Sequence, residues 1–317
     1  MTERAHCPFC GKNASFSQKT SHVDPQSNTH YDLYECSSCT GQFFEPLKNP
    51  GASWYEHDER YAGRNQDPIL DAQWNHKAVI AELQPTVGDV LDVGCGVGNF
   101  LAHAQSKGWN CWGIDFDKDA IEAGKKTFGL ANLFVSDIHE FRRVHSGKQF
   151  DLVTFFDVLE HIDDHERFME AVHSMVKDGG HIAMSMPHSA HAEFLMPTDV
   201  PPRHLTRWNE KSLTQFLNSH GFDITYLKPR AEGIRFIILK LRFKYGKKFS
   251  MGLVEKVREK AAVEGKPVGR RVLLARTLAL IKDTVLFGIP AFFIWLALLP
   301  TRKKYVSIVA IAHRRVR

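Results

Sequence analysis

A glycine-rich turn at residues 94–98 is the stretch of this 317-residue chain whose residue types most directly suggest ligand chemistry. An apolar run containing one acid, Asp92, precedes the turn, and the residues after it have a helical composition. The glycines have the spacing G-x-G-x-G and are Gly94, Gly96 and Gly98. A buried strand, a tight turn and a helix N-terminus in this order begin a nucleotide-binding α/β unit. Asn99 stands where a dinucleotide fingerprint has its third glycine, and the Asp92 carboxylate would repel a pyrophosphate, so the turn favours a cationic ligand.

Further acids follow other predicted strands. Asp115 ends the strand predicted over 109–114 and lies 21 residues beyond Gly94, where such folds place a carboxylate against ribose hydroxyls. Asp137 follows a short strand predicted over 133–135. At this strand end its carboxylate would accept a hydrogen bond from the amino group of a base. The predicted ligand-binding residues are Asp92, Gly94, Gly96, Gly98, Asp115, Phe116, Asp137, Ile138 and Asp157.

Four of the six cysteines form two C-x-x-C pairs near the N-terminus, each followed closely by glycine. The 25 residues between the pairs leave room for a hairpin, whose second strand is predicted over 31–36. Four such thiolates can form a tetrahedral zinc site, and a segment this short needs a structural metal ion of this kind to hold a fold. The predicted zinc ligands are Cys7, Cys10, Cys36 and Cys39. A redox pair and chance spacing are the alternatives, and the closed site predicts a role in architecture or partner binding. Cys95 and Cys111 are predicted to be small core residues.

The elements that must position these residues alternate between strand and helix from residue 86 to residue 230. The later predicted strands cover 150–156, 181–187 and 223–227, and the predicted helices cover 117–128, 163–176 and 209–220. This alternation predicts an α/β fold with a doubly wound sheet, and a buried strand over 305–313 would be its last. The predicted divisions are a zinc ribbon at 1–50, a helical lead-in at 51–85, a main domain at 86–230 plus 305–317, and a helical insertion at 231–304. In the lead-in, Tyr55, Tyr61 and Arg64 would either close over the ligand or pack a helix onto the sheet.

Several segments resemble, in their order, the motifs of class I S-adenosylmethionine-dependent methyltransferases. They are L-D-V-G-C-G-V-G at 91–98, Asp115, Asp137, F-D-L-V at 150–153 and V-L-E-H at 158–161. The resemblance implies a Rossmann-like methyltransferase fold that binds S-adenosylmethionine, whose ammonium and sulfonium charges suit Asp92. The segment R-H-L-T-R-W at 203–208 and Gly221-Phe222 resemble the branch of the ubiquinone-biosynthesis O-methyltransferases. The cysteine module resembles that of sugar and lipid methyltransferases in the same superfamily.

Methyl transfer to a hydroxyl needs alignment and a base, because the sulfonium already activates the methyl carbon. His161 and His204 are the candidate bases, since a histidine titrates near neutral pH. His161 has an alternative role in ordering its loop or lining the ligand site. His204 follows two prolines in a segment predicted to be a lid over the acceptor. The histidines at 139, 145 and 165 are predicted to lie on the surface.

Asp157, Glu160 and His161 also resemble the metal-binding triplet of some ubiquinone O-methyltransferases, in which a divalent ion polarises a catechol. The first position here is Asp instead of Glu, which shortens the reach of the carboxylate. In the preferred interpretation Asp157 is a strand-end acid that contacts the cofactor, and a helical turn follows it.

The charge of the chain is unevenly distributed. It has 41 Lys and Arg against 36 Asp and Glu, and 22 of the former but only five of the latter lie from Lys228 to Arg317. This C-terminal excess predicts a polyanionic partner, either nucleic acid or an anionic membrane leaflet. Residues 1–10 contain no apolar core of a signal peptide, and the paired cysteines suit a reduced compartment, so a cytoplasmic location is expected.

The stretch 285–300 carries no charge. It is shorter than the ~20 residues of a membrane-spanning helix, Pro290 interrupts it, and the chain must return to the sheet on the same side. These features predict an interfacial or re-entrant helix, with cationic amphipathic segments at 234–245 and 268–282, so that residues 231–304 bind an anionic membrane. The alternative is a buried helix or a dimer interface.

The sequence thus predicts a methyltransferase held peripherally on the cytoplasmic face of a membrane. Its expected reaction is O-methylation of a lipid headgroup, a polyprenyl-linked sugar or a prenylated phenol. An RNA methyltransferase that grips phosphate with its ribbon and basic tail is the first alternative, but it leaves the uncharged stretch unexplained, so nucleic acid is not the expected partner. A non-catalytic, membrane-recruited adaptor is the second, and the intact acids and glycines of the ligand site speak against it.

Overall fold

The computed structural model describes residues 4–51, 54, 73–84, 87–190, 199–231, 233–245 and 285–316. Met1–Arg230 with Ser307–Arg317 form one compact unit and Ala231–Val306 form another, and each is described by itself. The predicted lead-in residues Tyr55, Tyr61 and Arg64, and the predicted amphipathic segment at 268–282, lie outside the described residues.

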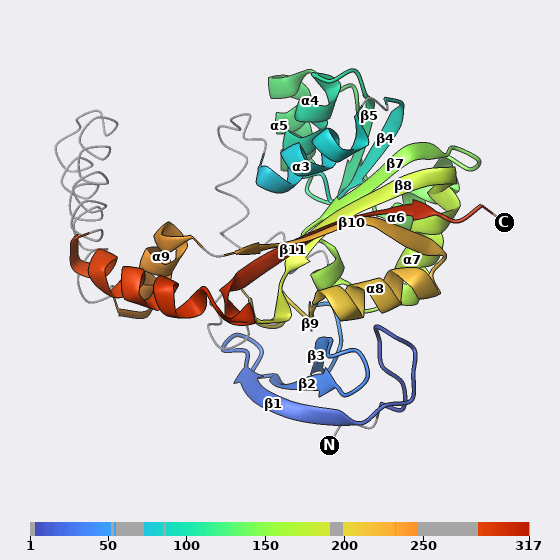
Figure 1. Cartoon of the computed structure of the whole chain (residues 1–317). Helices are drawn as coiled ribbons and strands as arrows, with labels where there is room; N and C mark the ends of the chain where they lie inside the picture. The colour runs from blue at the N-terminus through green and yellow to red at the C-terminus, as the bar shows by residue number, and fades with distance from the viewer. Residues whose placement is uncertain are drawn as a thin grey trace. The chain divides into compact units, whose positions relative to one another are not determined.

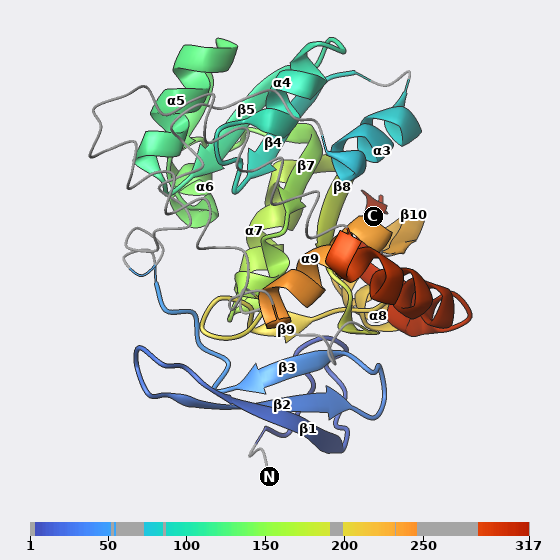
Figure 2. The same ribbon diagram turned by 90° about the vertical axis from the view of Figure 1, so that its left-hand side faces the viewer.

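A seven-stranded mixed sheet forms the centre of the first unit (Figures 1 and 2). In spatial order its strands are β10 (Phe222–Ala231), β11 (Tyr305–Arg314), β8 (Val176–Pro187), β7 (Phe150–Phe156), β4 (Asp89–Val93), β5 (Asn110–Asp115) and β6 (Asn132–Val135). The strands from β8 to β6 pair in parallel, whereas β11 pairs with β8 antiparallel. The predicted final strand at 305–313 is therefore confirmed. The chain runs outward from β4 through β5 to β6 and then resumes on the other side of β4 with β7, and ligands of α/β sheets bind at such a switch point.

Helices cover both faces of this sheet, as the predicted Rossmann-like alternation requires. One face packs against α3 (Trp74–Leu83), α4 (Asn99–Gln105) and α5 (Lys118–Phe128). The other face packs against α6 (Ile138–Val144), α7 (His165–Met175) and α8 (Glu210–Ser219). Neighbouring strand residues point to opposite faces, so Leu152 joins the first cluster and Val153 the second.

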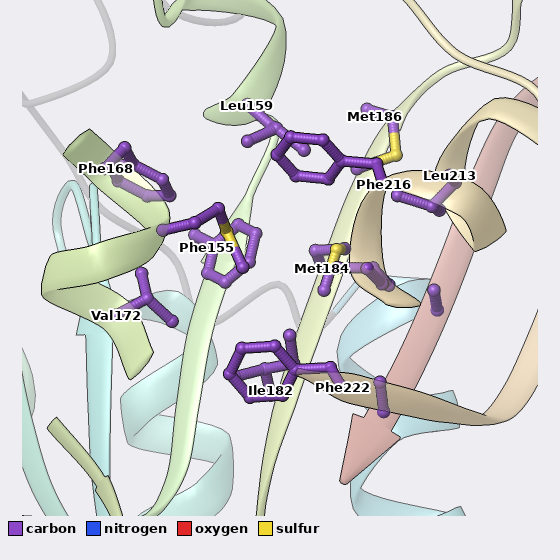
Figure 3. Close-up of a cluster of buried hydrophobic side chains, with 14 of the residues drawn as sticks. Phe155, Leu159, Phe168, Val172, Ile182, Met184, Met186, Leu213, Phe216 and Phe222 are labelled. Atoms are coloured by element: carbon purple, nitrogen blue, oxygen red, sulfur yellow. The ribbon is translucent and has the colours of Figure 1, made fainter. Parts of the chain in front are cut away.

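Figure 3 shows the second of these clusters, where Phe155 of β7 and Met184 of β8 lie between α7 and α8. Phe168 of α7 meets Phe155 edge-on at 5.4 Å between ring centroids, and Phe216 of α8 is fully buried. Burying each such side chain stabilises the fold by roughly 1.5–3 kcal/mol. This packing holds the carboxyl ends of β7 and β8, from which the candidate site is built.

Side-chain caps set where the predicted helices begin. Asp117 accepts the backbone N–H of Ala120 at the start of α5, and Asp164 accepts that of Arg167 at the start of α7. Asn209 forms a reciprocal capping box with Ser212 at the start of α8. The three helices predicted over 117–128, 163–176 and 209–220 are confirmed to within two residues at each end.

A second, four-stranded sheet contains the N-terminal hairpin. Its order is β1 (Phe16–Val23), β2 (His30–Cys36), β3 (Gln42–Glu45) and β9 (Thr206–Arg207). The predicted hairpin strand at 31–36 is confirmed as β2. Its fourth strand, β9, belongs to the segment just before α8, so residues far apart in sequence complete one sheet.

The other unit contains α9 (Ile234–Tyr245) and a helix at residues 285–298. Along that second helix Val285, Ile289 and Phe293 are exposed by 73%, 70% and 63%, whereas Ala291 is fully buried. The exposed residues recur every four positions and so share one face. Within the described residues, no helix combines the length and apolar character needed to cross a membrane.

Candidate active site

The glycine turn leaves room for a ligand at one position. Gly94, Gly96 and Gly98 all have positive φ angles, of 73°, 53° and 83°. A Cβ atom on Gly94 would lie 2.7 Å from the Val158 side chain, and one on Gly98 would lie 2.5 Å from Leu130. Among the described residues, a Cβ on Gly96 would meet nothing within 4 Å. The outer glycines therefore permit close packing of the protein itself, whereas Gly96 faces open space as far as the described part of the chain extends.

Asp115 holds this turn in place. Its Oδ2 accepts the backbone N–H of Gly96 at 2.8 Å, and its Oδ1 accepts that of Asp117 at 2.9 Å. Burial raises the pKa of Asp115. The side chain predicted to meet ribose hydroxyls thus also orders the glycine turn, and each oxygen keeps a further lone pair for a ligand. Beside it Phe116 is exposed, while Ile138 is buried.

Asp92 is a buried carboxylate next to the turn. Its Oδ1 accepts the hydroxyl of Thr154 at 2.6 Å. Burial, to which the nearby Asp115 carboxylate adds, raises the pKa of Asp92 to about 7. A cationic ligand would favour the ionised form of this acid.

The other two predicted ligand-binding acids have different surroundings. Asp137 caps α6, and its Oδ1 accepts the backbone N–H groups of His139 and Glu140 at 2.8 and 2.9 Å. Asp157 is exposed, adopts a positive φ of 53° and accepts the Ser185 hydroxyl at 3.0 Å. A left-handed conformation in a residue other than glycine stores strain, and such residues concentrate at functional sites.

His161 and His204, predicted separately, lie together. Their ring centroids are 4.9 Å apart, and the rings meet edge-on. His161 Nδ1 lies 2.6 Å from the carbonyl oxygen of Arg203. Because a carbonyl only accepts, this nitrogen carries the proton, and Nε2 keeps a lone pair. Burial, with a contribution from His204, lowers the pKa of His161 to about 3, so this ring stays neutral and is a weak base.

His204 is paired with a carboxylate. Its Nδ1 lies 3.3 Å from Oδ1 of Asp199. A carboxylate in this position orients the imidazole, as in the histidine–aspartate pairs of hydrolytic triads. Asp199 is not among the sequence-predicted residues, and the proline-rich segment around it offers no pattern that marks a functional acid.

Glu160 completes the cluster. Its carboxylate is fully buried, and neither oxygen has a hydrogen-bond partner within the described part of the chain. Burial and the neighbouring Asp157 raise the pKa of Glu160 well above its usual range. One ligand atom from each of Glu160, His161 and His204 lies within 4.8 Å of the others, a grouping that suits a divalent ion. The predicted triplet of Asp157, Glu160 and His161 is different, because Asp157 does not belong to this group, and His204 takes its place.

The four predicted zinc ligands also lie together. One sulfur from each of Cys7, Cys10, Cys36 and Cys39 lies within 4.8 Å of the others. The sulfurs of Cys7 and Cys39 are 3.6 Å apart, which is too long for a disulfide and close to the ~3.8 Å edge of a tetrahedral site with ~2.3 Å zinc–sulfur bonds. Backbone N–H groups of Phe9 and Gly41 point at the sulfurs of Cys7 and Cys39 at 3.4 Å. The residues fit a structural zinc ion.

Two minor predictions have opposite outcomes. Cys95 and Cys111 are buried, as predicted. His165 was predicted to lie on the surface, which is wrong, because its ring is buried and Nε2 lies 3.2 Å from the carbonyl oxygen of Leu159. The ring also packs edge-on against Trp208 at 5.5 Å. Polar spacing along α7 gave no sign of this burial, because the covering Trp208 lies far away in the sequence.

Comparison with known proteins gives one family and several partial matches. A family model described as a methyltransferase domain matches residues 62–227. A ubiquinone biosynthesis O-methyltransferase of Proteus mirabilis (strain HI4320) is 30% identical over 100 residues, 30% of this chain and 40% of that protein. Its counterpart in Escherichia coli O9:H4 (strain HS) is 29% identical over 175 residues, 44% of this chain and 73% of that protein.

A solved structure also matches. Phosphoethanolamine N-methyltransferase 2 of Haemonchus contortus, in complex with S-adenosyl-L-methionine, has 18% identity and a TM-score of 0.47, over 77% of this chain and 53% of that one. The chain therefore spans well under two thirds of the length of some of the proteins it matches.

Proposed function

The chain belongs to the methyltransferase-domain family and is an S-adenosylmethionine-dependent methyltransferase, and from that premise we propose that it methylates a hydroxyl of a membrane-held acceptor. The observation that carries this proposal is the pairing of His204 with Asp199 beside His161 and Glu160. This cluster follows β7 directly, and Val158 within the same segment packs against Gly94 of the glycine turn. A base therefore lies close to the predicted donor site.

On the donor side, we assign S-adenosylmethionine to the open space at Gly96. When bound, it supplies a methyl group on a positively charged sulfur. Asp92 would balance the positive charge of the ligand, and Asp115 would hold the turn and accept from ribose hydroxyls. Phe116, Asp137, Ile138 and Asp157 remain the proposed residues around the adenosine and amino-acid parts.

On the acceptor side, His204 would remove the proton of the acceptor hydroxyl through Nε2. The hydroxyl oxygen would take the methyl group, whose bond to the sulfonium sulfur would break and leave S-adenosylhomocysteine. Asp199 stabilises the imidazolium that results. His161 is better suited to orientation than to proton transfer, because its Nδ1 is held by the Arg203 carbonyl and its pKa is low. Of the two histidines predicted as bases, we therefore choose His204.

The Glu160 carboxylate, which has no hydrogen-bond partner among the described residues, favours a second arrangement of the same cluster. Glu160, His161 and His204 would together hold a divalent ion. When bound, such an ion polarises a hydroxyl oxygen as a Lewis acid. Both arrangements predict the same reaction, and dialysis against a chelator distinguishes between them. Under conditions in which the cysteine cluster keeps its zinc, activity should be lost only if Glu160, His161 and His204 hold a divalent ion.

The relatives' names and the exposed helix at 285–298 support the choice of acceptor. The matched relatives are named as O-methyltransferases of ubiquinone biosynthesis, which favours a hydroxyl over an amine. The exposed apolar face of Val285, Ile289 and Phe293 favours contact with lipid, and Arg302 and Lys303 follow this helix closely. Each basic residue near an anionic leaflet contributes ~1 kcal/mol of attraction. The chain would thus attach peripherally to a cytoplasmic membrane face.

Incubation with labelled S-adenosylmethionine tests the reaction. Wild-type protein and His204→Gln are each incubated with a total lipid extract and, separately, with total RNA. We expect label in an alkali-stable ether of a lipid-soluble product, and at least about a hundredfold less with the variant. Label in RNA alone, or equal labelling by the variant, would overturn the proposal.

Flotation with vesicles of phosphatidylglycerol and phosphatidylcholine tests the attachment. The double variant Ile289→Glu/Phe293→Glu should stay at the bottom of the gradient while wild type floats. Val23→Glu, at an exposed apolar position of β1, is the matched control and should float. Equal flotation of the double variant would remove the membrane from the proposal and leave the methyltransferase reaction intact.

A further inference from the structure

The four-cysteine ribbon is joined to the acceptor side by a strand pairing. In that pairing β3 of the ribbon and β9 are antiparallel neighbours, with Gln42 opposite Arg207 and Phe43 opposite Thr206. The backbone N–H of Phe44 extends the ladder by donating to the carbonyl of Leu205 at 2.8 Å. This places the ribbon one residue from His204.

Leu205 connects the ribbon to the catalytic cluster through its own backbone. Its carbonyl accepts from Phe44, and its N–H donates to the carbonyl of Glu160 at 2.8 Å. Two residues earlier, the carbonyl of Arg203 accepts a hydrogen bond from Nδ1–H of His161. His204 is therefore held between two backbone anchors, one of which also faces the ribbon.

Each cysteine pair also touches the end of the same segment. Next to Cys39, the carbonyl of Thr40 accepts the Nδ2–H of Asn209 at 2.7 Å. Between Cys7 and Cys10, Phe9 packs edge-on against Trp208 with 4.5 Å between ring centroids. Contacts from both pairs thus converge on the two residues that end the segment 203–209.

We propose that the ribbon is a positioning device, in which the four cysteines, held by zinc, fix the segment 203–209 and so place His204 against the acceptor. This rests on the proposed role of His204 as the base. A two-residue strand such as β9 has too few ladder bonds to be stable without its neighbour. A four-cysteine module of this size depends on its metal for folding, so metal loss would release β9.

The donor side is anchored differently. The glycine turn is held by the carbonyl of Ile114, which accepts the N–H of Gly94 at 2.8 Å, and by Asp115. Both partners belong to β5 of the large sheet. We therefore expect zinc to control the acceptor side and to leave cofactor affinity almost unchanged.

The test compares zinc-loaded and chelator-treated full-length protein, the variant Cys36→Ser, and the control Cys111→Ser, whose thiol lies outside the ribbon. Isotope-labelled histidine reports the ring signals of His204, assigned with His204→Gln, and calorimetry reports cofactor affinity. We expect zinc loss to shift or broaden the His204 signals and to change cofactor affinity by less than about twofold. With an acceptor in hand, turnover should fall about a hundredfold, since a misplacement of about 1 Å has this effect, and zinc should restore it.

If the zinc-free protein unfolds as a whole, the variant Asn209→Asp tests the positioning role of the ribbon instead. The carboxylate still caps α8 but cannot donate to Thr40 or to the Ser189 hydroxyl, so the cysteines stay intact while the hydrogen bonds donated by Asn209 Nδ2 are lost. Asp164→Asn, which exchanges the cap of α7, is the matched control. We expect one zinc per chain in both variants and shifted His204 signals only in Asn209→Asp.

Unchanged His204 signals in Asn209→Asp, and in any folded zinc-free protein, would overturn the positioning role. The His204 signals are measured without an acceptor, so they test the positioning role independently of the proposed reaction. If wild-type protein methylates no hydroxyl while the His204 signals still depend on zinc, the reaction is wrong and the coupling stands.

Discussion

The donor side and the acceptor side of the candidate site are built in different ways. The donor side, Asp92 with the glycine turn and Asp115, comes from one continuous strand–helix–strand stretch. The hydrogen bonds that hold the turn stay within this stretch, and a bond from Thr154 of β7 to Asp92 is added from outside it. The acceptor side joins Glu160 and His161 to a segment 42 residues later, which a separate sheet holds in place. The donor side is therefore set by local sequence, and the acceptor side by long-range pairing.

This difference has a functional meaning. A donor site built from contiguous residues stays the same whatever acceptor is used. An acceptor side assembled from a loop, a short strand and a separate sheet can change its residues without disturbing the donor site. Mutations on the two sides should therefore separate cofactor affinity from turnover.

The largest expected effect is on the acceptor side. His204→Gln removes the proposed base but keeps a polar side chain of similar length, so turnover should fall by roughly 10²–10⁴-fold. Cofactor affinity measured by calorimetry should remain within about twofold of wild type. The control His103→Gln changes a histidine on α4 and should keep wild-type turnover. A parallel loss of cofactor binding in His204→Gln would mean that the two sides are not separate.

The next largest effect is on the donor side. Gly96→Ala puts a methyl group into the open space at the turn, so cofactor affinity should fall about ten- to a hundredfold. Gly129→Ala is a matched control, because Gly129 has a similar φ of 66° and, like Gly96, has no described residue within 4 Å of an added Cβ. Both should lose about 1 kcal/mol of unfolding free energy from backbone strain. Equal cofactor affinity in the two variants would show that no ligand lies over Gly96.

The same difference explains how much could be predicted from the sequence. Alternating apolar runs and capping acids predicted the strands and helices around the switch point, including the final strand at 305–313. The glycine turn and Asp115 were both predicted to bind the ligand, because Asp115 lies 21 residues beyond Gly94, which is a local spacing. In the structure the two are joined by the hydrogen bond from Gly96 to Asp115.

The acceptor side could be predicted only in part. His161 and His204 were singled out as residue types, but nothing in their spacing indicated that their rings would meet, because the backbone bond from Leu205 to Glu160 brings them together. The exchange of Asp157 for His204 in the metal-binding group has the same cause. The pairing of β9 with the ribbon was also missed, since two residues carry no strand pattern.

The smallest predicted effect is a pH dependence of cofactor affinity and of stability that arises at Asp92 on the donor side. Burial raises the pKa of Asp92 from an unfolded value near 4 to about 7, so the neutral acid favours the folded apoprotein. Its stabilising contribution is fully present below the unfolded pKa and is lost as the pH rises through 7. Cofactor binding has the opposite sign, because a cation prefers the carboxylate, and affinity should rise about tenfold between pH 6 and pH 8.

Calorimetry and thermal unfolding over this pH range check both signs. Asp92→Asn should bind the cofactor weakly at every pH and lose the rise in affinity. Its stability should depend less steeply on pH than that of wild type, because Asp115 and Glu160, whose pKa values burial also raises, still contribute a fall with rising pH. Asp115 and the thiols of Cys95 and Cys111 are the other titratable groups coupled to Asp92. Burial raises the pKa of both thiols, and they stay neutral below pH 8, so they cannot produce the trend. If Asp92→Asn keeps the wild-type rise in affinity, a different acid on the donor side carries the charge that meets the cofactor, and Asp115, whose pKa is also raised by burial, is the next to be changed.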